Sequence, residues 1–466
     1  MRTDVTFDYT NLLAEAVGPE EGVTEPELEG VVEDCRRYHE ELERERQAGE
    51  LGFIQLPYDT AEVEAIRPAA EELRGRCENF VVLGIGGSAL GNIMLLEALC
   101  PPLYNLLPRD VRGGPRLFVL DNVDPTKLAS LLDLVDLEET VFNVITKSGS
   151  TAETLAQFLI VAGELRRRLS DRYREQVVVT TDPERGPLRA IATNEQLPSL
   201  AIPPSVGGRF SVLSSVGLLS AAVTGVDVEA LLAGAQAMDR RASEPDLRQN
   251  PAYLFAALHY LLYQKGKHLH VMMPYVDGLA SFADWFRQLW AESLGKERSL
   301  TGERVSVGPT PIKGLGVTDQ HAQLQLYVEG PADKVFTFIA VEEFARDLVI
   351  PDAFPQAEAL RYLPGHSLGE LLQNERRATT LVLTEKRRPN STLTLPRLNP
   401  HTLGQLIHLF AVATAFSGKL YGVNPFDQPG VEASKEATYA LMGRRGYEAL
   451  RREIERKLAS GSPHLL

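Results

Sequence analysis

An amide and a carboxylate stand four residues apart, at Gln288 and Glu292, in a stretch whose apolar pattern predicts a helix. Side chains at this spacing face the same way, so the two groups can act on one ligand. Large apolar residues flank them and would shield the carboxylate from water, namely Trp285, Phe286, Leu289 and Trp290. A shielded carboxylate is a stronger base, which makes Glu292 a candidate for proton transfer. The alternative is a surface glutamate near a helix end that Gly295 closes.

A run of hydroxyl residues predicts a phosphate-binding loop. Residues 146–154 read T-K-S-G-S-T-A-E-T and lead from a predicted strand into a predicted helix. Hydroxyls and free N–H groups meet there, where the helix dipole favours negative charge. The alternative is a capping box, formed by Thr151 with Thr154 or by Ser150 with Glu153. One hydroxyl suffices for a cap, so the cluster beside Lys147 favours a phosphate monoester site.

A glycine-rich loop provides a second candidate for anion binding. Residues 84–91 read G-I-G-G-S-A-L-G and also lie between a predicted strand and a predicted helix. Glycines allow an anion to come close to the helix N-terminus. The same letters fit the loose dinucleotide fingerprint G-x-G-x-x-A, with Asp121 at the end of the next strand as a ribose ligand. The loop alone therefore leaves phosphate and dinucleotide binding open.

Three further side chains could complete a site for proton transfer. Arg209 follows two glycines, where a permanent cation could stabilise negative charge on a substrate oxygen; a structural ion pair is the alternative. His321 lies in a polar segment beside Asp319, although a lone histidine is more often structural. Lys435 lies near the first turn of a predicted C-terminal helix. A lysine opposes the helix dipole there, so something other than helix stability places it.

Alternating strands and helices must position these loops. Apolar runs followed by helical patterns predict four strands in the first half of the chain, at 80–86, 116–121, 140–146 and 176–182. This order is typical of a parallel sheet covered on both faces, which binds ligands beyond the carboxyl ends of its strands. A second, less regular α/β unit follows, with predicted strands at 267–274 and 335–341 and helices at 252–264, 367–380 and 402–416.

The composition limits the classes of function. The chain has 466 residues, 44% hydrophobic and 24% charged, as is typical of a soluble globular protein of several domains. Its formal net charge of −15 repels nucleic acid, anionic membranes and phosphorylated substrates, so an anionic ligand must be attracted locally. We see no leader-like N-terminus and no apolar stretch that predicts a membrane span, which indicates the cytoplasm. Three cysteines without CxxC spacing argue against a disulfide framework and a zinc site.

Taken together, these segments resemble the glucose-6-phosphate isomerase (phosphoglucose isomerase) family in its bacterial form. The arginine motif and the last motif are highly specific, whereas G-I-G-G-S is shared with many sugar-phosphate binders. The shared motifs follow the family's order through nearly the whole chain: G-I-G-G-S at 84–88, K-S-G-S-T at 147–151, G-G-R-F-S at 207–211, Q-x-x-x-E-S-x-G-K at 288–296, Q-H-A at 320–322 and F-D-Q-P-G-V-E-x-x-K at 426–435.

The resemblance implies an α/β fold with two sugar-isomerase (SIS) type three-layer α/β domains, parallel central sheets, and helical N- and C-terminal extensions. We expect an N-terminal helical segment at 1–55 and a first domain, with the phosphate site, at 56–243. The second domain is expected at 244–416, and the C-terminal helical extension that carries Lys435 at 417–466.

The resemblance also implies an activity, the interconversion of glucose 6-phosphate and fructose 6-phosphate in glycolysis and gluconeogenesis, without cofactor or metal. Glu292 would carry a proton between C2 and C1 through a cis-enediol, beside Arg209, while His321 and Lys435 would act in ring opening. Gln288 would hold a sugar hydroxyl. The residues implied to bind phosphate are Gly86, Gly87, Ser88, Lys147, Ser148, Ser150 and Thr151. Members of the family usually form homodimers that share the active site, with the histidine contributed across the subunit interface.

Three alternatives stay open. An isomerase of this kind could also accept mannose 6-phosphate, since epimer choice depends on side chains near C2. A nicotinamide dehydrogenase could use residues 84–89 with Asp121. A non-catalytic regulator could sense sugar phosphates, but it would leave Glu292 and Lys435 without a purpose, and the acidic chain has no DNA-binding stripe.

Overall fold

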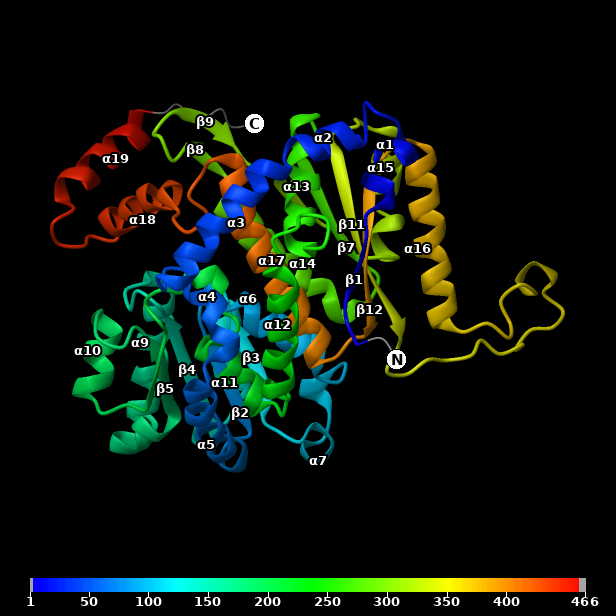
Figure 1. Ribbon diagram of the computed structural model, residues 1–466. Coiled ribbons are helices and arrows are strands. Elements are labelled where there is room, and N and C mark those ends of the chain that lie inside the picture. Colours follow the sequence, from blue (N-terminus) through cyan, green and yellow to red (C-terminus); the bar gives the residue numbers. More distant parts are fainter. Residues whose placement is uncertain (1–2, 461–466) are drawn as a thin grey trace.

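Two five-stranded sheets form the framework of the protein, each with helices on both faces (Figure 1). The computed structural model describes residues 3–460. In the first sheet all strands are parallel, in the order β3-β2-β4-β5-β6. Its strands are β2 (Asn79–Leu83), β3 (Arg116–Leu120), β4 (Thr140–Thr146), β5 (Val177–Thr181) and β6 (Ser199–Ala201). The four predicted strands and their parallel order are confirmed, and the short β6 is an addition at the sheet edge.

Alternate side chains of the first sheet enter two different cores. Phe80 and Val82 of β2 face a core shared with α5 (Thr60–Arg76), α6 (Leu90–Leu99) and α11 (Ser215–Val223). Val81 and Leu83 face a second core with α8 (Pro125–Leu134), α9 (Ala152–Leu169) and α10 (Pro187–Asn194). Strands buried on both faces are continuous apolar runs, which explains why the sequence predicts them well.

The second sheet has the order β1-β12-β11-β7-β10, parallel except for β1. Its strands are β1 (Thr6–Asp8), β7 (Leu269–Pro274), β10 (Thr310–Lys313), β11 (Lys334–Glu343) and β12 (Asn390–Arg397). The N-terminal segment, expected to be helical, also contains a short strand, because β1 pairs with β12. The short α15 (Leu324–Glu329) and α16 (Leu368–Glu385) cover the outer face of this sheet.

Four long helices fill the space between the sheets (Figure 1). They are α12 (Val228–Ala242), α13 (Pro251–Gln264), α14 (Ala280–Leu294) and α17 (Pro400–Tyr421). Helix α17 is long and apolar enough to cross a membrane, yet 94% of its most apolar window is buried inside the fold. One hydrophobic core joins these helices to the inner faces of both sheets.

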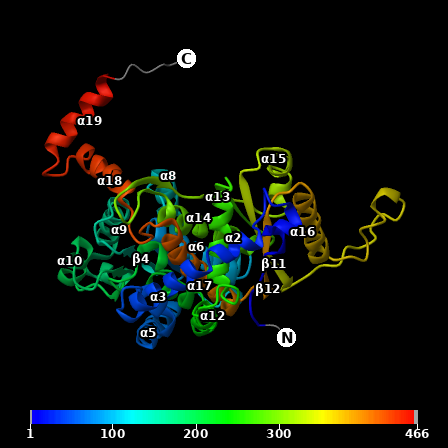
Figure 2. The same cartoon turned by 45° about the horizontal axis from the view of Figure 1, so that its top comes forward.

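The remaining elements lie outside the two sheets and the four long helices between them. The N-terminal helices are α1 (Ala14–Val17), α2 (Glu25–Gly30), α3 (Val32–Gln47) and α4 (Gly52–Gln55), while α7 (Arg109–Arg112) precedes β3. A two-stranded ribbon pairs β8 (Lys296–Arg298) with β9 (Arg304–Val307). The C-terminal extension, expected to be helical, contains α18 (Pro429–Leu441) and α19 (Glu448–Ser460). This pair and the segment 344–367 project from opposite sides of the molecule (Figures 1 and 2).

Candidate active site

Helix α14 presents Gln288 and Glu292 side by side, as their spacing predicts. The Gln288 Nε2 donates a hydrogen bond of 3.0 Å to Glu292 Oε2. The Glu292 side chain is 26% exposed, and its Oε1 lies 3.5 Å from Nη1 of Arg209. Glu292 is therefore not a free surface glutamate, because it is partly buried and paired with both an amide and a cation.

The apolar residues around Glu292 anchor helix α14 in the core. Phe286 and Trp290 stack on each other with ring centroids 5.4 Å apart, and Phe286 also packs edge-on against Phe410 of α17. All four apolar residues predicted to shield the carboxylate are buried in the core between the sheets. This packing fixes the position of α14 along its axis and its rotation about that axis. Glu292 lies at the boundary between the core and the site.

Arg209 is the most completely enclosed cation of the candidate site. It lies in a short turn of helix at Gly208–Phe210, and its side chain is 3% exposed. Its Nε donates to Ser293 Oγ at 2.7 Å and its Nη1 to Gln428 Oε1 at 3.1 Å. Its Nη2 donates to the carbonyl oxygens of Pro425 and Asp427. Burial lowers the pKa of the guanidinium, but arginine stays charged, so a permanent cation is fixed beside Glu292.

The glycine-rich loop packs directly against these two elements. Gly86 has φ = +56°, and a Cβ there would lie 2.9 Å from Nε2 of Gln288. A Cβ on Gly87 would lie 2.2 Å from the carbonyl oxygen of Gly208, too close for any side chain. The glycines are thus explained by the approach of the loop to α14 and to the Arg209 turn. The loop brings Ser88, at the end of a short turn of helix, to the same place.

The hydroxyl loop follows the neighbouring strand β4, so it opens at the same sheet edge as the glycine-rich loop. Thr146 and Thr151 share a hydrogen bond of 2.7 Å between their hydroxyls, and Ser150 Oγ lies 3.2 Å from Ser148 Oγ. Thr151 is the N-cap of α9, yet it makes no side-chain capping bond. The capping-box alternative was therefore wrong. The hydroxyls bond to one another at the start of a long helix, where they can turn towards an anion.

Lys147 ties the hydroxyl loop to the Arg209 loop. Its Nζ donates to the carbonyl oxygens of Pro204 and Val206, at 2.9 and 2.6 Å. Burial lowers the pKa of its ammonium. A direct bond from Lys147 to a phosphate would have to replace one of these carbonyls or use its third N–H.

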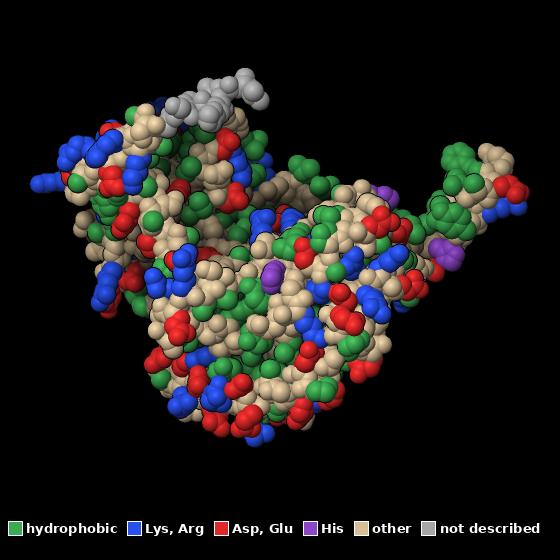
Figure 3. Space-filling view, turned by 90° about the horizontal axis from the view of Figure 1, so that it is seen from above, with side chains coloured by type: hydrophobic (Ala, Val, Ile, Leu, Met, Phe, Trp, Pro, Cys, Tyr) green, Lys and Arg blue, Asp and Glu red, His purple; other side chains and the backbone are tan. Residues whose placement is uncertain are grey.

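His321 and Lys435 are both exposed and are not hydrogen-bonded to this group in the part of the chain that the structure describes. Lys435 is exposed on α18 and forms an ion pair of 2.8 Å with Glu432. His321 is exposed, and within residues 3–460 no hydrogen bond or ion pair joins it or Lys435 to Glu292. The hydroxyl of Tyr439 lies 3.4 Å from the Ser150 carbonyl oxygen, which brings α18 to the hydroxyl loop. Seen from above, the molecule is hollowed between the C-terminal helices and the rest of the fold (Figure 3).

Two residues of the site were not singled out from the sequence, although motifs contain them. Lys296 donates to the main-chain carbonyls of Glu292 and Asp427, at 2.9 and 2.7 Å. Gln428 accepts from Arg209. The signal that could have found them is their place in the same motifs as Glu292 and Lys435, at 288–296 and 426–435.

Known proteins resemble this chain over nearly its whole length. Residues 70–447 match the family model described as phosphoglucose isomerase. Glucose-6-phosphate isomerase of Carboxydothermus hydrogenoformans is 49% identical over 93% of this chain and 94% of its own. The enzyme of that name from Rubrobacter xylanophilus is 49% identical over 96% of this chain and 100% of its own.

Solved structures share the fold. A hypothetical protein from Thermus thermophilus superposes with a TM-score of 0.82 and 38% identity, over 94% of this chain and 100% of its own. A glucose-6-phosphate isomerase from Chlamydia trachomatis gives a TM-score of 0.80 at 24% identity, over 98% and 92% of the two chains. With a family match over most of its length and relatives of 49% identity, the chain belongs to the phosphoglucose isomerase family.

Proposed function

We propose that this protein interconverts glucose 6-phosphate and fructose 6-phosphate. The observation that carries the proposal is the convergence of Glu292, Gln288 and Arg209 beside two loops suited to phosphate. The family match and relatives named glucose-6-phosphate isomerase support the same reaction. The reaction belongs to glycolysis and gluconeogenesis, and we place it in the cytoplasm.

The chemistry needs a base, a stabilised oxyanion and an anchored phosphate. The Glu292 carboxylate takes the proton from C2 of the open-chain aldose, and the electron pair moves onto the carbonyl oxygen at C1. Arg209 stabilises the negative charge of the resulting enediolate. The same carboxyl group returns the proton to C1 while the proton of the C2 hydroxyl passes to the oxygen at C1, which leaves the ketone at C2 and restores the base. Phosphate held by the loops at 86–88 and 148–151 orients the reacting carbons, and Gln288 holds a sugar hydroxyl.

Substitution Glu292→Gln tests the assignment of the base. The amide keeps the shape and can still face Gln288 but cannot accept the proton, so turnover should fall by roughly 100-fold or more. Binding of inorganic phosphate should change little, because the loops are intact. Glu303→Gln, on an exposed residue near the β8–β9 ribbon, serves as the control. A Glu292→Gln enzyme with near-normal turnover in the conversion of fructose 6-phosphate would refute the role.

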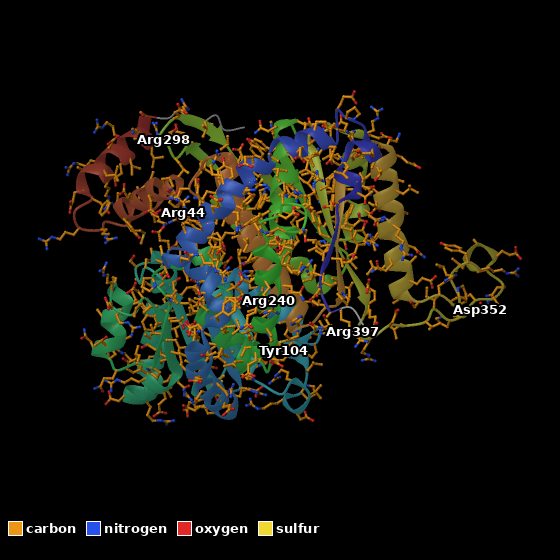
Figure 4. All side chains as sticks on the ribbon, in the orientation of Figure 1. Arg44, Tyr104, Arg240, Arg298, Asp352 and Arg397 are labelled. Atoms are coloured by element: carbon orange, nitrogen blue, oxygen red, sulfur yellow. The ribbon has the colours of Figure 1, made fainter. Side chains whose placement is uncertain are left out.

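We further propose that the enzyme acts as a homodimer in which His321 completes the site of the partner, where it opens the sugar ring together with Lys435. His321 is exposed and makes no hydrogen bond or ion pair with Glu292 within residues 3–460, so its action needs another copy of the chain or a movement within the chain. The segment 344–367, marked by Asp352 in Figure 4, projects from the body. It exposes large apolar side chains, with Val349 and Tyr362 each 70% accessible, and such a surface is typical of an interface.

Mixed dimers test this sharing. Glu292→Gln and His321→Gln enzymes are each expected to be inactive. If a two-fold dimer shares its sites, every mixed dimer has one site with both residues intact, so an equal mixture should regain about a quarter of the normal activity after subunit exchange. If each chain builds its own site, every site carries one lesion and nothing is regained. That outcome would refute the shared site and leave the role of Glu292 untouched.

Two rival functions fit the structure less well. A dehydrogenase would use Asp121 for a ribose, but that carboxylate pairs with Lys127 at 2.9 Å. A regulator would not need the pairing of Glu292 with Arg209. Assay of mannose 6-phosphate beside fructose 6-phosphate distinguishes a strict isomerase from one that also accepts the C2 epimer.

A further inference from the structure

Lys296 is a buried cation to which the proposed chemistry gives no role. It follows Gly295, directly after the end of α14, and its side chain is 5% exposed. Its Nζ donates to the carbonyl oxygens of Glu292 and Asp427 and lies 3.3 Å from Oδ1 of Asp427. A lysine ammonium has three N–H donors, so all of them are engaged. Burial lowers the pKa of this ammonium, so keeping it charged here has a cost.

The contacts of Lys296 close a ring with the two groups proposed to do the chemistry. The carbonyl oxygen of Asp427 accepts from Lys296 at 2.7 Å and from Nη2 of Arg209 at 3.1 Å. Arg209 lies 3.5 Å from the Glu292 carboxylate, and the carbonyl of Glu292 accepts from Lys296 at 2.9 Å. We call Glu292, Arg209, Asp427 and Lys296 the four-residue ring. It joins α14, the Arg209 turn and the turn at 425–428 that leads into α18.

We propose that Lys296 is a positioning residue for the isomerase reaction, which holds Arg209 in place relative to the Glu292 carboxylate by fixing the turn at 425–428. The inference rests on the proposed function, since it presupposes the roles of Glu292 and Arg209. Lys296 acts through the shared carbonyl of Asp427 and does not touch the reacting carbons.

The end of α14 explains why a lysine suits this position. The last carbonyls of a helix have no partner within the helix. Gly295 N–H takes the carbonyl of Ala291, and Lys296 takes the next one, that of Glu292 itself. A cation is favourable at a helix C-terminus. The same ammonium thus caps α14, which bears Glu292, and binds the turn at 425–428, which contacts Arg209.

The role is testable because a mere loss of stability and a loss of positioning give different kinetics. Methionine keeps the apolar stem of lysine and removes the three donors. Lys296→Met should lower kcat by roughly 10–100-fold, because a displacement of about 1 Å in a catalytic group costs that much. The KM for fructose 6-phosphate and the inhibition constant of inorganic phosphate should change by less than about threefold, since the phosphate loops are unaltered.

Lys334→Met is the matched control. Lys334 is equally enclosed, 5% exposed, and pairs with Asp333 at the start of β11 in the second sheet. Lys334→Met should lower the free energy of unfolding, measured in urea, about as much as Lys296→Met does, but should leave kcat unchanged. If Lys296→Met does not fold, Lys296→Arg carries the same test, because it keeps the charge but not the three-way geometry.

The inference is overturned if the Lys296 variant keeps kcat within about threefold, or if Lys334→Met loses kcat to the same extent. A rise in KM and in the phosphate constant at unchanged kcat would equally overturn it. Failure of the proposed function looks different, because it would show as turnover in Glu292→Gln, whatever Lys296→Met does.

Discussion

Replacing Arg209 by lysine keeps a positive charge in the site but should destroy both its geometry and its catalytic effect. The guanidinium makes hydrogen bonds with Ser293, Gln428 and the carbonyls of the turn at 425–428. A single ammonium on a shorter reach cannot satisfy these acceptors together. A lysine has three N–H donors for these four acceptors, so at least one acceptor would be left unpaired, and the free energy of unfolding should fall by about 1–3 kcal/mol.

The loss of turnover should exceed what this destabilisation explains. Removing one preorganised donor to a developing oxyanion typically lowers kcat by about 100–1000-fold, and we expect the same range for Arg209→Lys. The matched control is Arg112→Lys. Arg112 is also 3% exposed and donates to Glu78 and to the carbonyls of Leu107 and Gly114. It precedes β3, so it lies at the amino ends of the strands, opposite the glycine-rich and hydroxyl loops.

The two variants are compared by urea unfolding and by initial rates with fructose 6-phosphate, well below the unfolding midpoint. Both should lose similar stability, and only Arg209→Lys should lose kcat. Retention of kcat within about threefold in Arg209→Lys, or an equal loss in Arg112→Lys, would refute the assignment of Arg209 to the oxyanion.

Two further results are expected. Ser148→Ala should raise the KM for fructose 6-phosphate by roughly 10-fold, with a smaller change in kcat, because one hydrogen bond to a charged phosphate is lost; initial rates check this, and an unchanged KM would contradict it. Burial raises the pKa of Asp239, but hydrogen bonds from His408, Tyr58 and Arg46 outweigh burial and lower it to about 2 from 3.8. Asp239 therefore stabilises the fold by about 2 kcal/mol above its unfolded pKa and loses that stabilisation as the pH falls towards 2. Asp239→Asn should lower the free energy of unfolding at pH 7 by at least this amount. Urea unfolding should show that the difference between the two proteins narrows below about pH 5; a difference that does not change with pH would contradict the role of the Asp239 charge.

The sequence predicts the strands that are continuous apolar runs and misses β1, β10 and also β12 (Asn390–Arg397), a buried strand whose residues N-S-T-L-T-L-P-R mix polar and apolar types. The first-sheet strands are apolar runs between helices, so their pattern is local. β1 has three residues and forms a strand because Thr6 faces Thr394 of β12. β10 contains Pro311, which argues against a strand by propensity, yet it lies at the sheet edge where proline is tolerated. The strands that pair with β1 and β10 cannot be inferred from the residues next to β1 and β10 in the sequence.

The same division holds in the candidate site. The pairing of Gln288 with Glu292 follows from helix geometry, and the sequence predicts it. The hydrogen bonds from Arg209 to the turn at 425–428 join segments more than two hundred residues apart, and only the fold brings these segments together. The resemblance also implied that Lys147 binds the phosphate, while in the structure its Nζ donates to two main-chain carbonyls.

In the proposed site, a chain with a net charge of −15 has to attract a phosphorylated sugar locally. In the four-residue ring, the cations Arg209 and Lys296 face the carboxylates of Glu292 and Asp427, so the ring carries no net charge to attract a dianion. Lys147 is engaged with carbonyls. We therefore expect the attraction to come from directed dipoles, the N–H groups at the start of α9 and in the glycine-rich loop, and from hydroxyls. Such groups act only at short range, so they should select a ligand that fits both loops and leave other anions repelled by the surface.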